Sequence, residues 1–169
     1  MHMKTIYLVR HAKSDWKNAH NGDFDRTLNE RGLKAAPFMA ALLKEKKVFP
    51  ELVISSPAIR AITTAELFCD TLDYPKEQIL QRIEIYEGGV LDLLKVVQQI
   101  PDNCTTAMLF GHNPMLTEFS NLLAGSYIDN LATCGTVRID MDIDSWKNAN
   151  PDAGELIWYD APKKHQERD

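Results

Sequence analysis

The chain has 169 residues, of which 44% are hydrophobic and 25% are charged, a balance that suits one globular domain with a sizeable core. Its formal net charge of -5 argues against broad binding to nucleic acid or to anionic membranes. The three cysteines lie far apart and form no Cys-x-x-Cys pair, which argues against a disulfide framework and a zinc site. The apolar run Ile6–Val9 is too short for a signal peptide or a membrane span, so we expect a cytoplasmic protein.

The first part of the chain predicts a strand, a helix and a second strand. Thr5–Val9 is short, apolar and β-branched, as buried strands are. Residues 27–30 read Thr-Leu-Asn-Glu, which has the S/T-x-x-E form of a capping box and predicts a helix through Leu43. Pro37 either delays the start of this helix or kinks it. The second strand, Glu51–Ile54, is ended by two serines and a proline.

The middle of the chain continues the alternation. A helix over Ala58–Leu72 follows Pro57, and Ile79–Ile85 is compatible with one short strand. The next elements are a helix over Val90–Gln99, a strand over Thr106–Phe110 and a helix over Met115–Leu123.

The last part of the chain adds strands over Thr136–Met141 and Glu155–Tyr159, separated by a surface loop over Ser145–Gly154. We find no internal repeat and no linker-like change of composition, so residues 1–169 are expected to form a single domain. Alternating strands and helices predict an α/β fold, a three-layer α/β/α sandwich around a mostly parallel central sheet.

Histidines and arginines follow three of the predicted strands. Arg10 and His11 follow the first strand, Arg60 lies near the start of the helix after the second, and His112 follows the third. Each alone has an ordinary interpretation, as a packing histidine, a surface arginine or part of a turn. Ligands of such sheets bind outside the carboxyl ends of the strands, where these side chains would meet. Two arginines and two histidines, with no metal-binding carboxylate in the same segments, suit a dianion such as a phosphoryl group.

Four segments together resemble the histidine phosphatase superfamily, which has the phosphoglycerate mutase-like fold. They are LVRHAKSDW from Leu8, DFDRTLNERG from Asp23, SSPAIRA-x-x-TAE from Ser55 and GHNPMLTEFSNLL from Gly111. The segments occur in the family's order and look most like the short SixA-type phosphohistidine phosphatases. The resemblance extends from Leu8 to about Leu123.

The resemblance implies roles for individual residues. His11 matches the nucleophile that forms a covalent phosphohistidine, with its other ring nitrogen donating to a neighbour. Arg10, Arg60 and a protonated His112 match the groups that bind and stabilise the phosphoryl oxygens, so no metal and no cofactor is expected. Lys13, in the loop after the nucleophile, is a further candidate phosphate ligand, although loop exposure alone also explains it.

The general acid is the open question. Asn113 stands where the acid phosphatase branch of the family has its aspartate, and it offers no carboxyl proton. Glu87 lies roughly where the mutase-like branch keeps its acid, and Asp15 is a second candidate. An alkoxide leaving group needs a proton, whereas imidazole has a pKa of about 6.5 and leaves more readily. A site without a dedicated acid therefore suits phosphohistidine.

Other polar residues near these motifs have structural interpretations. Ser55 and Ser56 are predicted to cap the following helix. Asp25 and Arg26 are predicted to pair near the rim of the site. Cys134 lies in a turn without a base or a phosphate-binding loop beside it, so no nucleophilic role is predicted.

Three functions remain open at this point. The first is hydrolysis of phosphohistidine on a protein, the second is hydrolysis of a small phosphorylated metabolite, and the third is a non-catalytic module that binds a phosphorylated partner. A binding module would not need His11, which favours the two enzymes. The sequence leaves the oligomeric state open.

Overall fold

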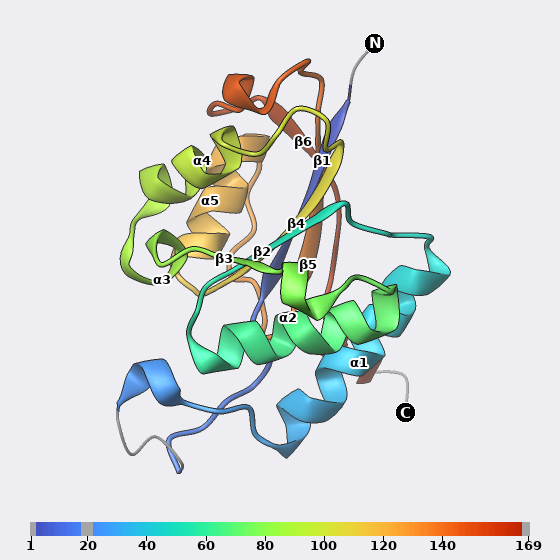
Figure 1. The fold of residues 1–169 in the computed structure, drawn as a ribbon, viewed down its shortest axis with the longest axis vertical. Helices are drawn as coiled ribbons and strands as arrows, with labels where there is room; N and C mark the ends of the chain where they lie inside the picture. Colours follow the sequence, from blue (N-terminus) through green and yellow to red (C-terminus); the bar gives the residue numbers. More distant parts are fainter. Residues whose placement is uncertain (1–2, 18–21, 167–169) are drawn as a thin grey trace.

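The computed structural model describes residues 3–17 and 22–166 (Figure 1). Its strands are β1 (Lys4–Arg10), β2 (Leu52–Ser55), β3 (Leu80–Gln81), β4 (Thr106–Gly111), β5 (Thr136–Met141) and β6 (Gly154–Asp160). They form one six-stranded sheet in the order β3-β2-β4-β1-β5-β6. The pairs β3-β2, β2-β4 and β4-β1 are parallel, whereas β5 is antiparallel to both of its neighbours. β6 therefore runs in the direction of β1.

Helices cover both faces of this sheet. They are α1 (Glu30–Glu45), α2 (Ile59–Leu72), α3 (Glu84–Glu87), α4 (Val90–Gln98), α5 (Met115–Ala124) and α6 (Pro162–Gln166). Figure 1 shows α1 and α2 on one face of the sheet and α4 and α5 on the other. The predicted α/β fold with three layers is confirmed.

Neighbouring residues of β1 pack into different helical layers. Ile6 and Leu8 belong to the core that contains residues of α4 and α5. Tyr7 and Val9 belong to the core that contains residues of α1 and α2. All four side chains are at most 5% exposed. Burial on both faces explains why this strand reads as a continuous apolar run rather than an alternating one.

The predicted start of α1 is wrong by two residues. The helix begins at Glu30, and the side chain of its N-cap, Asn29, accepts a hydrogen bond from the N–H of Gly32 at 2.9 Å. Leu28 is instead part of an isolated β-bridge with Ser14, which keeps the preceding backbone extended. Pro37 lies inside α1 and does not delay its start.

The predicted surface loop over Ser145–Gly154 is wrong near its start. A short 3-10 helix covers Trp146–Asn148, and Trp146 is fully buried. The indole N–H of Trp146 donates to the carbonyl of Cys104 at 2.8 Å, so this segment closes one end of the core. Within residues 3–17 and 22–166, no helix has the length and apolar character needed to cross a bilayer.

Candidate active site

Backbone hydrogen bonds hold His11 just beyond the carboxyl end of β1. The N–H of His11 donates to the carbonyl of Gly111 at 3.1 Å, and the carbonyl of His11 accepts from the N–H of Cys134 at 3.0 Å. The next residue, Ala12, donates its N–H to the hydroxyl of Thr64 at 3.0 Å. Three separate segments therefore fix the chain on both sides of the imidazole.

The ring of His11 is oriented by its own backbone. Its Nδ1 lies 2.7 Å from the carbonyl oxygen of Ala12, which can only accept, so Nδ1 carries the proton and Nε2 keeps a lone pair. Burial lowers the pKa of His11 to about 4, and the charges of Arg60, Arg10 and Arg26 add to this shift. The imidazole is therefore neutral at pH 7, as a nucleophile requires.

His112 stands beside His11 at the end of β4. The two ring centroids are 5.3 Å apart, and Nε2 of His112 lies 2.7 Å from the hydroxyl of Ser56. Burial lowers the pKa of His112 to about 3, assisted by His11, Arg60 and Arg10. The imidazole is therefore neutral at pH 7 rather than protonated as the resemblance implied, because burial and the neighbouring arginines both disfavour its charged form. A phosphoryl dianion would oppose that shift.

Arginines converge on the same place. Arg60 is only 5% exposed, and its guanidinium donates to the backbone and carboxylate oxygens of Asp23 at 2.7 and 3.0 Å. Arg10 donates to the carbonyl of Leu131 at 2.9 Å. Four buried nitrogens have no hydrogen-bond partner among the described residues: Nε of Arg10, Arg26 and Arg60, and Nδ1 of His112. Buried donors without partners are rare and mark a site where an anion can bind.

Asp23 connects the groups around the site. Its carboxylate accepts hydrogen bonds from Arg26, Arg60 and Tyr86 at 2.9, 3.0 and 2.8 Å. Burial raises the pKa of Asp23, but these hydrogen bonds outweigh it and lower the pKa to about 2. The predicted pairing of Arg26 with Asp25 is therefore wrong, because Asp23 lies one turn of 3-10 helix away and takes that place.

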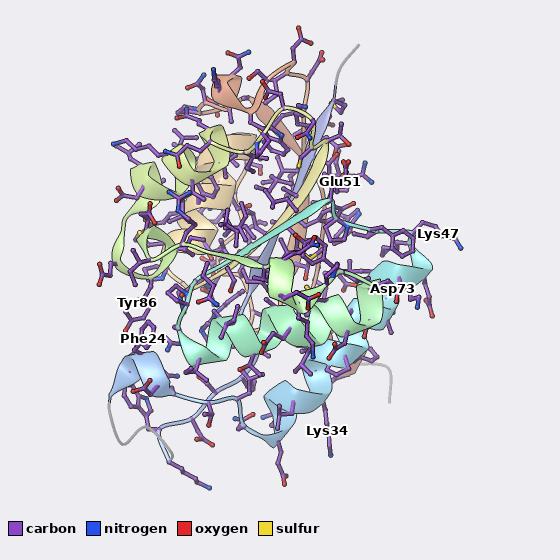
Figure 2. All side chains as sticks on the ribbon, viewed as in Figure 1. Phe24, Lys34, Lys47, Glu51, Asp73 and Tyr86 are labelled. Carbon is purple, nitrogen blue, oxygen red and sulfur yellow. The ribbon has the colours of Figure 1, made fainter. Side chains whose placement is uncertain are left out.

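Tyr86 is a site residue that the sequence analysis missed. Its ring centroid lies 5.5 Å from that of His112 and 5.2 Å from that of Phe24. Figure 2 shows Tyr86 and Phe24 next to each other, between α3 and the short helix at Asp23–Asp25. The only sequence signal was its position beside Glu87.

The candidate acids lie outside this hydrogen-bonded group. Glu87 ends α3 and is exposed. Asp15 accepts a hydrogen bond from the N–H of Lys17 at 3.2 Å. Asn113 has a structural role, since its amide donates to Asn130 and to the carbonyl of Leu131 and accepts from both donors of Thr117. The side chain of Asn113 is thus occupied by structural hydrogen bonds. Glu87 directly follows Tyr86, whose ring contacts that of His112.

The structure places the side chain of Lys13 in a pocket lined by residues of α1 and α6. Its side chain borders a pocket of about 240 Å³ together with Arg31 and Lys163, and neither His11 nor His112 lines that pocket. The backbone of Lys13 is held against α1, where its carbonyl accepts from the N–H of Asn29 at 3.0 Å.

The serine and cysteine predictions have different outcomes. α2 begins at Ile59 with Ala58 as its N-cap and no side-chain cap, so the capping predicted for Ser55 and Ser56 is wrong. Ser56 instead accepts from the N–H of Ala58 at 3.2 Å and contacts His112. Cys134 is fully buried, and burial raises the pKa of its thiol to about 12, which agrees with a non-nucleophilic cysteine.

Comparison with known proteins identifies relatives along most of the chain. The sequence pattern of the histidine phosphatase superfamily (branch 1) matches residues 6–107. An uncharacterized chloroplastic protein of Arabidopsis thaliana is 28% identical over 164 residues, which are 92% of this chain and 74% of that protein. A 2,3-bisphosphoglycerate-dependent phosphoglycerate mutase of Erythrobacter litoralis is 36% identical over 98 residues, which are 55% of this chain and 43% of the mutase.

Solved structures share the whole fold. The protein histidine phosphatase SixA in complex with tungstate superposes with a TM-score of 0.83 at 23% identity, covering 95% of this chain and 99% of that one. A structure from Agrobacterium tumefaciens that carries the SixA name has a TM-score of 0.78 at 25% identity, covering 94% of this chain and 98% of that one. The sheet and its helices thus define a phosphoglycerate mutase-like fold. The chain belongs to the histidine phosphatase superfamily.

Proposed function

We propose that this protein is a phosphatase that hydrolyses phosphohistidine on a partner protein through a covalent intermediate on His11. One observation carries the proposal. A buried, neutral imidazole has its Nδ1 committed to the carbonyl of Ala12. It stands among arginine and histidine nitrogens that have no hydrogen-bond partner in the part of the chain that the structure describes. A lone pair on Nε2 beside unpaired cationic donors is the arrangement that attack on a phosphoryl group requires.

In the first step, Nε2 of His11 attacks phosphorus while the bond from phosphorus to the leaving nitrogen breaks. The leaving imidazole takes up a proton from solvent. As charge grows on the ring of His11, the hydrogen bond from Nδ1 to Ala12 strengthens and stabilises it. Arg10 and Arg60 bind the equatorial phosphoryl oxygens, for which planar guanidinium groups are suited.

In the second step, water attacks the phosphohistidine. The bond between phosphorus and Nε2 breaks, inorganic phosphate leaves, and His11 returns to its neutral form. His112 binds and stabilises the phosphoryl oxygens in both steps. Because the arginines supply the positive charge, the proposed reaction uses no metal and no cofactor.

The choice of phosphohistidine rests on the side chains that border the site. Asn113 has its amide oxygen and nitrogen engaged in structural hydrogen bonds, and Glu87 is exposed. A leaving group that departs without a strong acid, as imidazole does, fits this arrangement better than an alkoxide. The SixA neighbours, one of which is named a protein histidine phosphatase, point the same way.

A small phosphomonoester is the second candidate substrate. The partial similarity to phosphoglycerate mutases supports it, as does the position of Glu87 next to Tyr86, whose ring contacts that of His112. In that case Glu87 would be the proton donor. Lys13 remains a proposed phosphate ligand only if its side chain turns from its own pocket toward His11.

The test is phosphate release from a phosphohistidine-bearing protein and from a panel of phosphomonoesters, with the His11→Ala variant as control. We expect release from phosphohistidine that depends on His11, with weak release from esters in both Glu87→Gln and wild-type protein. Strong release from one ester that falls in the Glu87→Gln variant would replace the proposal with the metabolite phosphatase. Equal release by His11→Ala and wild type would remove His11 as the nucleophile.

A further inference from the structure

A groove runs between α1 and α6, next to the loop that follows β1 and contains Lys13. Two pockets form it, of about 240 and 400 Å³, and both are lined by Ala35, Pro162 and Gln166. Because three residues line both pockets, the pockets adjoin each other. Residues of α1 and α6 also contact each other directly.

One end of the groove is basic. Lys13, Arg31 and Lys163 line the first pocket, and they come from the loop after β1, from α1 and from α6. Within residues 3–17 and 22–166 none of these three side chains forms an ion pair. Three cations that form no ion pair with any described residue lie at one place in a protein with a net charge of -5, and they mark a site for acidic groups.

The other end of the groove contains an exposed aromatic side chain. Phe38 is 45% exposed there, and its ring meets that of His165 edge to face at 5.4 Å. His165 is held by the carboxylate of Asp160 at 2.9 Å. Lys34 borders this end as well, and Figure 2 shows it on the outer side of α1. An apolar side chain next to acidic ones would therefore match the groove.

The basic end lies at the same edge of the sheet as His11. β6 runs in the direction of β1, so the helix that follows it emerges at the edge where β1 ends. Lys13 is two residues beyond His11. Ala132 and Thr133, which line the basic pocket, directly precede Cys134, whose N–H binds the carbonyl of His11. Segments that flank or hold His11 therefore form part of the wall of the basic pocket.

We propose that this groove binds an acidic, partly apolar segment of the phosphoprotein substrate and so determines which phosphohistidine reaches His11. The proposal rests on the phosphohistidine phosphatase function proposed above. Carboxylates of the segment pair with Lys13, Arg31 and Lys163, and a neighbouring apolar side chain packs against Phe38. The groove thus adds affinity and selectivity at a distance from the reacting atoms.

The experiment compares three substrates: phosphoramidate, a phosphohistidine peptide with a flanking segment rich in glutamate and leucine, and the same peptide with glutamine in place of glutamate. The wild-type protein is expected to prefer the glutamate peptide. In the double variant Arg31→Glu and Lys163→Glu, kcat/KM for that peptide should fall about tenfold, since favourable charge pairs become repulsive. Hydrolysis of phosphoramidate should stay at the wild-type level.

A matched control separates docking from net charge. Lys95→Glu with Lys147→Glu changes the charge equally, on exposed positions of the α4 side of the sheet. This control is expected to keep the peptide preference. If the groove variant loses phosphoramidate hydrolysis too, the neutral pair Arg31→Gln and Lys163→Gln replaces it and should lose only the peptide preference.

Two results would overturn the inference. One is equal kcat/KM for the two peptides in the wild-type protein, and the other is an equal loss in the control variant. Neither result would contradict the proposed function. That function is contradicted instead if none of the three substrates is hydrolysed in a reaction that requires His11. Added salt gives an independent check, because it should weaken the glutamate preference of the wild type, as exposed charges are screened.

Discussion

Lowering the pH from 7 to 5 is expected to destabilise the folded protein, because His11 and His112 resist protonation where they are buried. Their pKa values of about 4 and about 3 lie below the ordinary value of 6.5. The unfolded chain therefore takes up protons that the folded protein excludes. The full free energy of unfolding is present at pH values above the pKa of the histidines in the unfolded chain. It decreases progressively as the pH falls below that pKa.

The size of the effect follows from these values. Between pH 7 and pH 5, each histidine removes about 2 kcal/mol from the free energy of unfolding. Together the two histidines remove about 4 kcal/mol, a large share of the stability of a domain of this size. Asp23, with a pKa of about 2, loses its contribution only at lower pH and does not enter this window.

The assay is urea unfolding followed by circular dichroism at several pH values, for the wild type and for His112→Gln. The fall in the free energy of unfolding between pH 7 and pH 5 should be about 2 kcal/mol smaller in the variant. The reasoning is refuted if the wild type is equally stable at both pH values, or if the two proteins lose the same amount.

Three further predictions concern the segments that hold His11. In Gly32→Ala, the new Cβ would collide with the carbonyl of Lys13, so thermal unfolding should show a loss of about 1–3 kcal/mol, and an unchanged stability would contradict this. Thr64→Val leaves the buried N–H of Ala12 without its acceptor, so kcat should fall more than KM rises and stability should drop by about 1–3 kcal/mol; Thr64→Ser should restore both. Cys134→Ala should keep its phosphatase activity, because the hydrogen bond from Cys134 to His11 comes from the backbone N–H; loss of activity in a folded variant would point to a chemical role for the thiol.

The sequence predicted the strands well for a physical reason. β1 and β4 are buried on both faces of the sheet. Short apolar runs such as Thr5–Val9 and Thr106–Phe110 are typical of strands in this position. The meeting of His11 with His112 follows from the rule that ligands bind at the carboxyl edge of parallel strands. These parts of the site depend on local patterns and on one topological rule.

Other parts depend on contacts that no local pattern contains. The hydroxyl of Tyr86 donates a hydrogen bond to Asp23, which lies 63 positions away in the sequence. The local sequence around either residue therefore does not predict this contact. The capping motif at residues 27–30 gives a wrong start because Leu28 pairs with Ser14, and this tertiary contact outweighs the local cap. The groove between α1 and α6 requires the path of the chain after β6, which composition does not predict.

The most direct test of the central claim is to trap the covalent intermediate. The protein is mixed with a phosphohistidine peptide, quenched within its first turnovers under alkaline conditions, digested and examined by mass spectrometry. We expect a phosphoryl group on His11, absent from the His11→Ala variant and lost on acid treatment. Rapid turnover of the peptide with no phosphoryl group on His11, or with the group on another residue, would contradict the account.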